Sequence, residues 1–193
     1  MPLGSVFKLS DGSVATSLQK RYDSMLAGNA SYIPGNYYSI SSATVDSSGA
    51  SSITFSSIPS TYTHLQLTIL AQGTSSNSEV GIRFNSDSTS NYAAHRIVGN
   101  GSTVNVTPGT YSNTIADGLT YVIPTGGSIF GVVIFDILDY ANTNKNKTVR
   151  HLGGWDSNGS GQIAFMSDVW LSTSAITSIT VLATSTNLAQ YST

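Results

Sequence analysis

From residue 36 onward, the chain consists of short runs rich in β-branched and aromatic residues, separated by clusters of Ser, Gly, Asn and Pro. The first group of residues favours extended strands, and the second favours the turns between them. Residues 64–69 also alternate apolar and polar side chains, as a strand with one buried face does. The pattern predicts strands at residues 37–46, 51–57, 63–71, 79–85, 92–99, 103–107, 119–123, 128–139, 147–156, 161–172 and 176–184.

The spacing of these runs indicates how the strands are arranged. Many short strands joined by turns are typical of antiparallel sandwiches and barrels, whereas parallel sheets need crossover helices. A chain of 193 residues suits one domain with a single core. We therefore predict an all-β fold, a single jelly-roll-like antiparallel β-sandwich over residues 36–193. Residues 129–135 are apolar on both faces, which is typical of a central strand, and residues 156–161 predict a turn.

The first 35 residues follow a different pattern. Their apolar residues recur at spacings of three and four, which is the period of an α-helix. The spacing predicts a short N-terminal helix at about residues 13–27, which Gly28 and Asn29 could end. Its apolar stripe consists of Val14, Leu18, Tyr22, Met25 and Leu26. A short amphipathic helix is marginal alone in water, so residues 1–35 are expected to anchor the protein by docking on a partner or on its own sandwich.

Charge is scarce throughout the chain. Only 9% of the residues are charged, against about 25% in ordinary domains. The net charge of −2 gives no field that would attract nucleic acid. Cysteine is absent, and we find neither a secretion signal nor an apolar run long enough to insert in a membrane. Such a surface suits a protein packed among identical neighbours better than a free enzyme.

Catalytic groupings do not stand out in the sequence. There is no G-x-S-x-G motif, and His64, His95 and His151 lie singly on predicted strands, which favours structural roles. Among the carboxylates, Asp156 and Asp168 could meet across a hairpin, but nothing selects them over ordinary turn and edge residues. We therefore expect no enzyme activity, no catalytic residue and no cofactor.

Metal and sugar binding were considered at the turn near residue 156. Asp156, Asn158 and Ser160 resemble the first half of a calcium loop, but Ser167 stands where the closing Glu would be, so we predict no metal site. Aromatic side chains on a sandwich can stack on sugars, although they more often pack in the core. Trp155, Tyr140 and Asp156 are the candidates for contact with a host surface glycan.

Four stretches carry a resemblance to a known family. They are SSITFSSIPSTYTHL at 51–65, IRFNSD at 82–87, FDILDYANTNK at 135–145 and ITSITV at 176–181. In order and spacing, they resemble a family of small β-sandwich domains in virion structural proteins of tailed bacteriophages, of the minor tail, fibre or head-decoration type. The resemblance covers about residues 36–193. Similar sequences continue past the equivalent of Thr193 with a final strand, which predicts that this strand is either missing here or supplied by a neighbour.

The resemblance implies a function and a location. It predicts a non-catalytic structural protein of the virion that docks on the particle through its N-terminal segment and displays the sandwich. Its partners would be other virion proteins and copies of itself, with a trimer favoured. The alternative is a lectin-like module for adhesion to host glycans.

Overall fold

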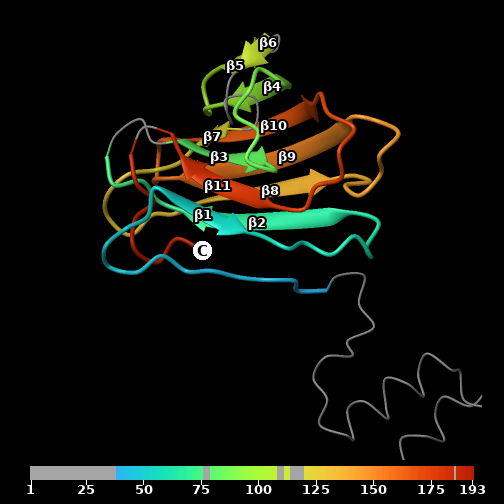
Figure 1. The fold of residues 1–193 in the computed structure, drawn as a ribbon. Coiled ribbons are helices and arrows are strands. Elements are labelled where there is room, and N and C mark those ends of the chain that lie inside the picture. Colours follow the sequence, from blue (N-terminus) through green and yellow to red (C-terminus); the bar gives the residue numbers. More distant parts are fainter. Residues whose placement is uncertain (1–37, 76–78, 108–110, 114–119, 185) are drawn as a thin grey trace, which may run out of the picture. The chain divides into compact units, whose positions relative to one another are not determined.

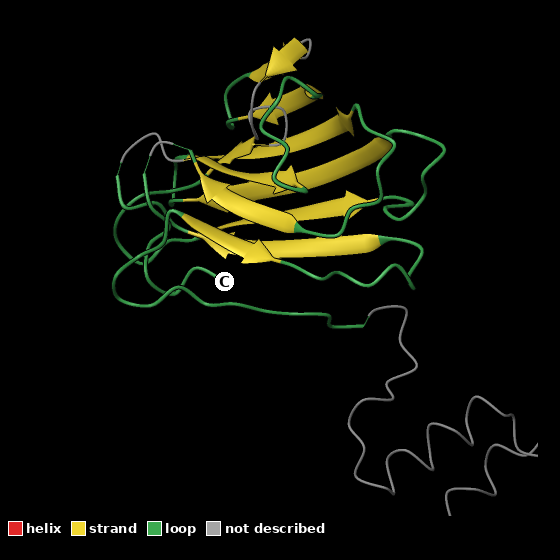
Figure 2. Cartoon of the chain, in the orientation of Figure 1, coloured by secondary structure: helices red, strands yellow, loops and turns green. Residues whose placement is uncertain are grey.

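The computed structural model describes residues 38–75, 79–107, 111–113, 120–184 and 186–193. The chain divides into two units, residues 1–40 and 41–193, and the fold described here is that of the second unit. Its described part consists only of strands and loops (Figure 2). The predicted helix at residues 13–27 lies outside the described residues.

Within the described residues, eleven strands form two antiparallel sheets. The four-stranded sheet has, in spatial order, β1 (Ser52–Phe55), β11 (Ile179–Ala183), β3 (Glu79–Phe84) and β7 (Thr120–Val122). The seven-stranded sheet has, in spatial order, β2 (Leu65–Ala71), β8 (Gly131–Ile137), β9 (Lys147–Asp156), β10 (Gly161–Trp170), β4 (Tyr92–Gly99) and β5 (Val104–Thr107), and β6 (Tyr111–Asn113) also pairs with β4. Figure 1 shows β11 and β3 in front of the larger sheet.

The expected all-β sandwich is thus confirmed for the described residues. Successive strands mostly alternate between the sheets: β1, β3, β7 and β11 belong to the small sheet, and β2, β4 and β8 to the large one. The long β9–β10 hairpin lies between β8 and β4 and widens the large sheet.

The core lies between the two sheets and follows from the period-two pattern. Every second residue of β8 faces inward and is buried, from Gly131 to Ile137. At one end of the core, Phe84, Tyr92 and Trp170 pack ring against ring, with centroids 5.5–6.4 Å apart. Burial of such large apolar side chains is the main favourable term for folding.

Two sequence expectations need correction. Residues 38–46 form no strand, although residues 37–46 are rich in Tyr, Ile and Val, because their backbone finds only isolated partners. Val45 N, for example, donates to Ser192 O at 2.8 Å, and Tyr191 N donates to Val45 O. The three-residue strand β6 was not predicted, since it is too short to show a pattern.

The last residues pack on the sandwich. Thr193 exchanges two backbone hydrogen bonds with Leu70 of β2, at 2.7 and 2.8 Å, and Leu188 is buried. Part of the β2 edge is therefore paired within the chain.

The predicted turn at residues 156–161 is confirmed. Ser157 N donates to Ser160 O, and Asn158 and Gly159 have positive φ. A Cβ at Gly161 would lie 2.4 Å from Trp155 O, so only glycine fits where β10 begins.

Candidate functional site

The residues expected to contact a partner or glycan fall into two groups. The docking residues Val14, Leu18, Tyr22, Met25 and Leu26 lie outside the described residues. Of the glycan candidates, Tyr140 is fully buried, and its hydroxyl donates to Pro59 O. A sugar therefore cannot reach it.

Trp155 and Asp156 do not form a site with Tyr140. Tyr140 precedes β9, whereas Trp155 and Asp156 end this ten-residue strand. Trp155 is half-buried and packs against the core. Asp156 accepts a hydrogen bond from Asn158 N at 2.7 Å, which stabilises its own turn.

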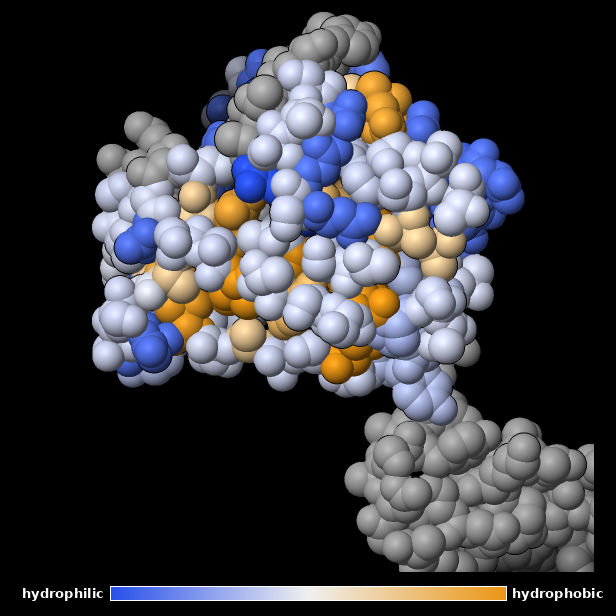
Figure 3. All heavy atoms as spheres, viewed as in Figure 1, coloured by the Kyte–Doolittle hydropathy of each residue, from blue (hydrophilic) through white to orange (hydrophobic). Residues whose placement is uncertain are grey.

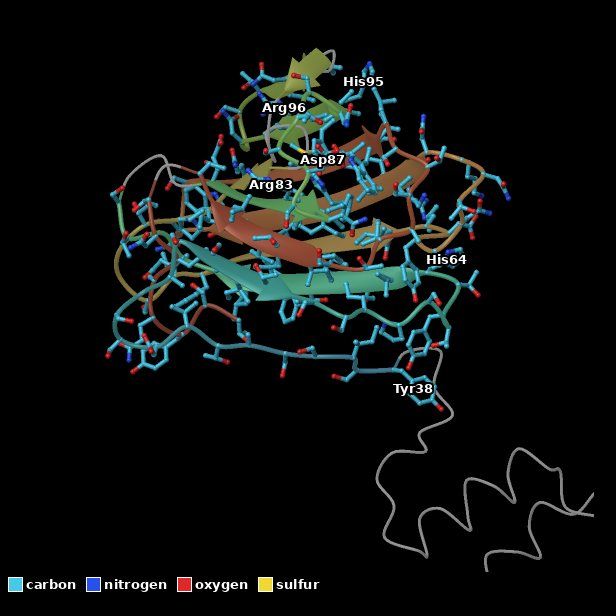
Figure 4. All side chains as sticks on the ribbon, viewed as in Figure 1. Tyr38, His64, Arg83, Asp87, His95 and Arg96 are labelled. Atoms are coloured by element: carbon cyan, nitrogen blue, oxygen red, sulfur yellow. The ribbon has the colours of Figure 1, made fainter. Side chains whose placement is uncertain are left out.

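The three histidines are spread over the sandwich. His64 lies beside Asp139 at one end, far from His95 on β4 (Figure 4). His151 is buried on β9. Among the described residues, no group of three or more His, Cys, Asp or Glu could hold a metal ion. Asp156 and Asp168 do not meet, since they oppose Gly161 and Val149 respectively.

One ionisable pair lies in the core between the sheets. His151 Nδ1 is 3.0 Å from Asp168 Oδ2, and both side chains are fully buried. The contact is not aligned as a hydrogen bond, and no described residue supplies either Asp168 oxygen with one. Phe135 packs on the imidazole edge to face, and the Met166 sulfur contacts its Nε2. Burial raises the pKa of Asp168, and the contact with His151 opposes this. A pair sealed from solvent cannot meet a substrate, so its role is structural.

Asp87 joins the turn after β3 to the aromatic end of the core. Its Oδ2 accepts hydrogen bonds from Trp170 Nε1 at 2.7 Å and from Asn91 Nδ2 at 2.9 Å. Its Oδ1 accepts from Thr89 N at 2.9 Å. Partial burial raises the pKa of Asp87, but these hydrogen bonds together outweigh burial and hold it far below its ordinary value of 3.8.

Asp87→Asn is expected to lower the free energy of unfolding by about 2 kcal/mol at pH 7, because it weakens charge-assisted hydrogen bonds. A carboxylate with a lowered folded-state pKa stabilises the fold above its unfolded pKa and loses this effect as the pH falls. The difference from wild type should therefore shrink from pH 5 to pH 2. Urea unfolding at several pH values measures it, with Asp156→Asn as control. A pH-independent difference would contradict the assignment.

The most unusual surface is the outer face of the seven-stranded sheet. Residues that alternate with the core positions point outward, and the register aligns them in rows across the strands. The first row consists of Ile134, Leu152, Phe165, Ile97 and Val106. The second consists of Leu70, Val132, Gly154, Ile163, Gly99 and Val104. We call these two rows the apolar face.

Several large side chains of the apolar face are open to solvent. Phe165 is 51% exposed, Ile163 60% and Val106 71%. A third row beside them is polar and consists of Gln66, Asp136, Arg150, Ser167 and His95. Within this row, Gln66 Nε2 donates to Asp136 Oδ1 at 2.9 Å. Contiguous apolar patches rimmed by polar residues mark interaction sites on soluble proteins.

The small sheet has an outer face of opposite character. Thr54 and Thr180 point outward there and share a hydrogen bond of 3.0 Å, with Arg83 opposite Thr180 on the next strand. The side of the molecule seen in Figure 3 is mostly pale, with blue hydrophilic residues and several orange hydrophobic patches between them.

Sequence reasoning missed this surface, although its signal was present. Residues 129–135 were predicted to form a central strand, and β8 does lie between β2 and β9, yet Val132 on its outer face is 40% exposed. Apolar residues also occupy outward positions on both strands of the β9–β10 hairpin. The sequence pattern indicates that both faces of these strands are apolar. It does not indicate whether the outer face is covered by another part of this chain or by another molecule.

Comparisons with family models, with curated proteins and with solved structures give no match for this chain. The resemblance to phage virion domains therefore rests on the sequence motifs. No helix in the described part of the chain is long and apolar enough to cross a membrane.

Proposed function

We propose that this protein is a non-catalytic structural component of a virus particle, of the tailed-bacteriophage type, and that it packs against neighbouring proteins through the apolar face. The observation that carries the proposal is a row of Ile, Leu, Phe and Val side chains across five strands of the large sheet. Four of them, Leu152, Phe165, Ile97 and Val106, are exposed, and Ile134 is half-buried. The long β9–β10 hairpin supplies its centre, Leu152 and Phe165.

The energetics favour a covered face. Burying roughly 400 Å² of apolar surface is worth about 10 kcal/mol at about 25 cal/mol per Å². Association itself costs on the order of 4–15 kcal/mol, so an interface needs most of this face to be stable. A particle, in which many copies are held close together, lowers the cost for each contact.

The strand order supports a jelly-roll assignment for the sandwich. β1, β11, β3 and β7 on one sheet, and β2, β8, β4 and β5 on the other, follow the alternation of an eight-stranded jelly roll with the β9–β10 hairpin inserted. Jelly rolls build many viral capsid domains and also lectins, so this support for a virion role is an analogy of fold.

The N-terminal segment is the proposed anchor. Residues 1–35 carry the predicted helix at about 13–27, with one apolar stripe that includes Leu18 and Tyr22. The protein would then attach to the particle in two ways, through the N-terminal segment and through the apolar face. Copies of the chain and other virion proteins are the proposed partners.

Purified particles are expected to contain the protein, and quantitative mass spectrometry measures its copies relative to the major capsid protein. Hundreds of copies would indicate head decoration, and a few to a few tens would indicate a tail or fibre part. Deleting residues 1–30 is expected to reduce the copy number strongly, because the anchor is lost. Absence of the full chain from particles would contradict the proposal, and unchanged incorporation of the deletion variant would contradict the anchor.

A glycan array separates this function from adhesion. The lectin-like alternative would be favoured if the protein were absent from particles and bound a glycan on the array, and if Trp155→Ala abolished that binding. Trp155 is suited to this control because it lies beside the exposed turn at Asp156 and is only half-buried.

A further inference from the structure

We infer that the apolar face is covered by a second copy of this chain, packed sheet against sheet about a two-fold axis. The inference rests on the proposed function, in which this face is the contact surface, and it names the partner. Two properties of the face point to a second copy, its pattern of side chains and its distribution of charge, and its size sets the scale of the contact.

The size of the face sets the scale of the interface. Six neighbouring strands span about 25 Å, and the two apolar rows occupy about 14 Å along the strands, so the apolar face covers on the order of 350 Å². With the polar row beside it the contact reaches on the order of 500 Å², which is a small interface compared with the roughly 800 Å² that a standard one buries on each partner. Two twisted sheets can also pack face to face with about 10 Å between them, as the two sheets of a sandwich do.

The side-chain pattern is compatible with its own two-fold copy. In a two-fold interface the same patch serves both partners, so residue i meets residue j and residue j meets residue i. An axis that runs along the strands between β9 and β10 places Leu152 opposite Phe165 of the second copy. The same axis places Ile134 opposite Ile97. At the end of the row, Val106 lies opposite Thr68 of the second copy, while the contacts between the other four positions are apolar against apolar.

The charges follow the same symmetry. In the polar row, this axis brings Asp136 opposite His95 of the second copy, and Arg150 opposite Ser167. A carboxylate thus faces an imidazole, and a guanidinium faces a hydroxyl. No like charges oppose each other along this row, and the chain's net charge of −2 gives little repulsion between copies.

A trimer, which the family resemblance implied, makes different demands. A three-fold ring needs two different complementary surfaces on every subunit. The apolar face is one surface that fits itself, whereas the opposite face of the sandwich presents threonines. The described strands therefore favour a two-fold pair.

Sedimentation velocity of the full chain tests the inference between about 1 and 100 µM. We expect a species of twice the chain mass of 20.2 kDa. Phe165→Glu places a carboxylate in the centre of both halves of the interface, and we expect it to weaken dimerisation at least ~100-fold. Phe165→Leu should retain the dimer. Thr54→Glu, on the outer face of the small sheet, is the matched control and should also retain it.

A charge exchange tests the axis itself. Asp136→Lys should weaken the dimer because lysine would face His95, and the added change His95→Asp should restore it. The inference would be overturned by a chain that is monomeric at all concentrations, by a trimer, or by a dimer that Phe165→Glu does not weaken. It would also be overturned if adding His95→Asp to Asp136→Lys did not restore the dimer. Thermal unfolding of each variant shows that it is folded. If particles contain the protein while the purified chain stays monomeric, the proposed function stands and only the two-fold partner is wrong.

Discussion

Replacing Asp168 with leucine is expected to lower the free energy of unfolding by about 4 kcal/mol, because it leaves His151 buried without its partner. The imidazole lies 3.0 Å from the carboxylate, and neither side chain reaches water. Once the carboxylate is removed, the imidazole of His151 loses its polar partner and lies against Phe135 and Met166. Urea unfolding at pH 6 measures the change.

The double variant Asp168→Leu/His151→Leu separates this explanation from simple loss of packing. A buried pair replaced by apolar residues of similar volume often costs nothing, so the double variant should be more stable than the single one by at least about 2 kcal/mol. No described residue gives the Asp168 oxygens an aligned hydrogen bond, so replacing both partners leaves no buried polar atom of the pair unsatisfied. If the losses of the two single variants simply added, the pair would not be coupled.

The sandwich was largely predictable from sequence because each strand carries its own signal. In β2, Leu65, Leu67 and Ile69 alternate with Gln66 and Thr68, and the structure places the first three inward. This pattern depends only on the neighbouring residues. The strand wrongly predicted at residues 37–46 has a different origin, since the partners of residues 41–50 lie at residues 188–193, far away in the chain.

The features that could not be predicted depend on contacts between strands that are distant in sequence. His151 and Asp168 were visible as single polar residues in β strands, but their approach depends on the register of β9 against β10. Tyr140 was a candidate for glycan contact because aromatic side chains on a sandwich can stack on sugars. The structure instead buries it, with its hydroxyl bonded to Pro59. The apolar face likewise emerges only when five strands are aligned side by side.

Lys147→Met is expected to lower the free energy of unfolding by about 3 kcal/mol, since buried carbonyl groups without a donor cost about 1–3 kcal/mol each. Lys147 begins β9 and is fully buried opposite Trp170. Its ammonium donates to the carbonyl oxygens of Asn142 at 2.7 Å, Lys145 at 3.1 Å and Thr173 at 3.1 Å. Methionine keeps most of the apolar stem but supplies no donor.

Lys145→Met is the matched control two residues earlier. Lys145 forms an exposed ion pair with Asp139, so its loss should cost less than about 1 kcal/mol. The three carbonyls around Lys147 belong to two loops, before β9 and after β10, so Lys147→Met should also speed proteolysis in both loops. Equal losses of stability in the two variants would contradict this role. A larger loss of stability in Lys147→Met than in Lys145→Met would show that the buried ammonium of Lys147, bound by backbone carbonyls, holds the open end of the β9–β10 hairpin together. The outer face of the same hairpin carries Leu152 and Phe165.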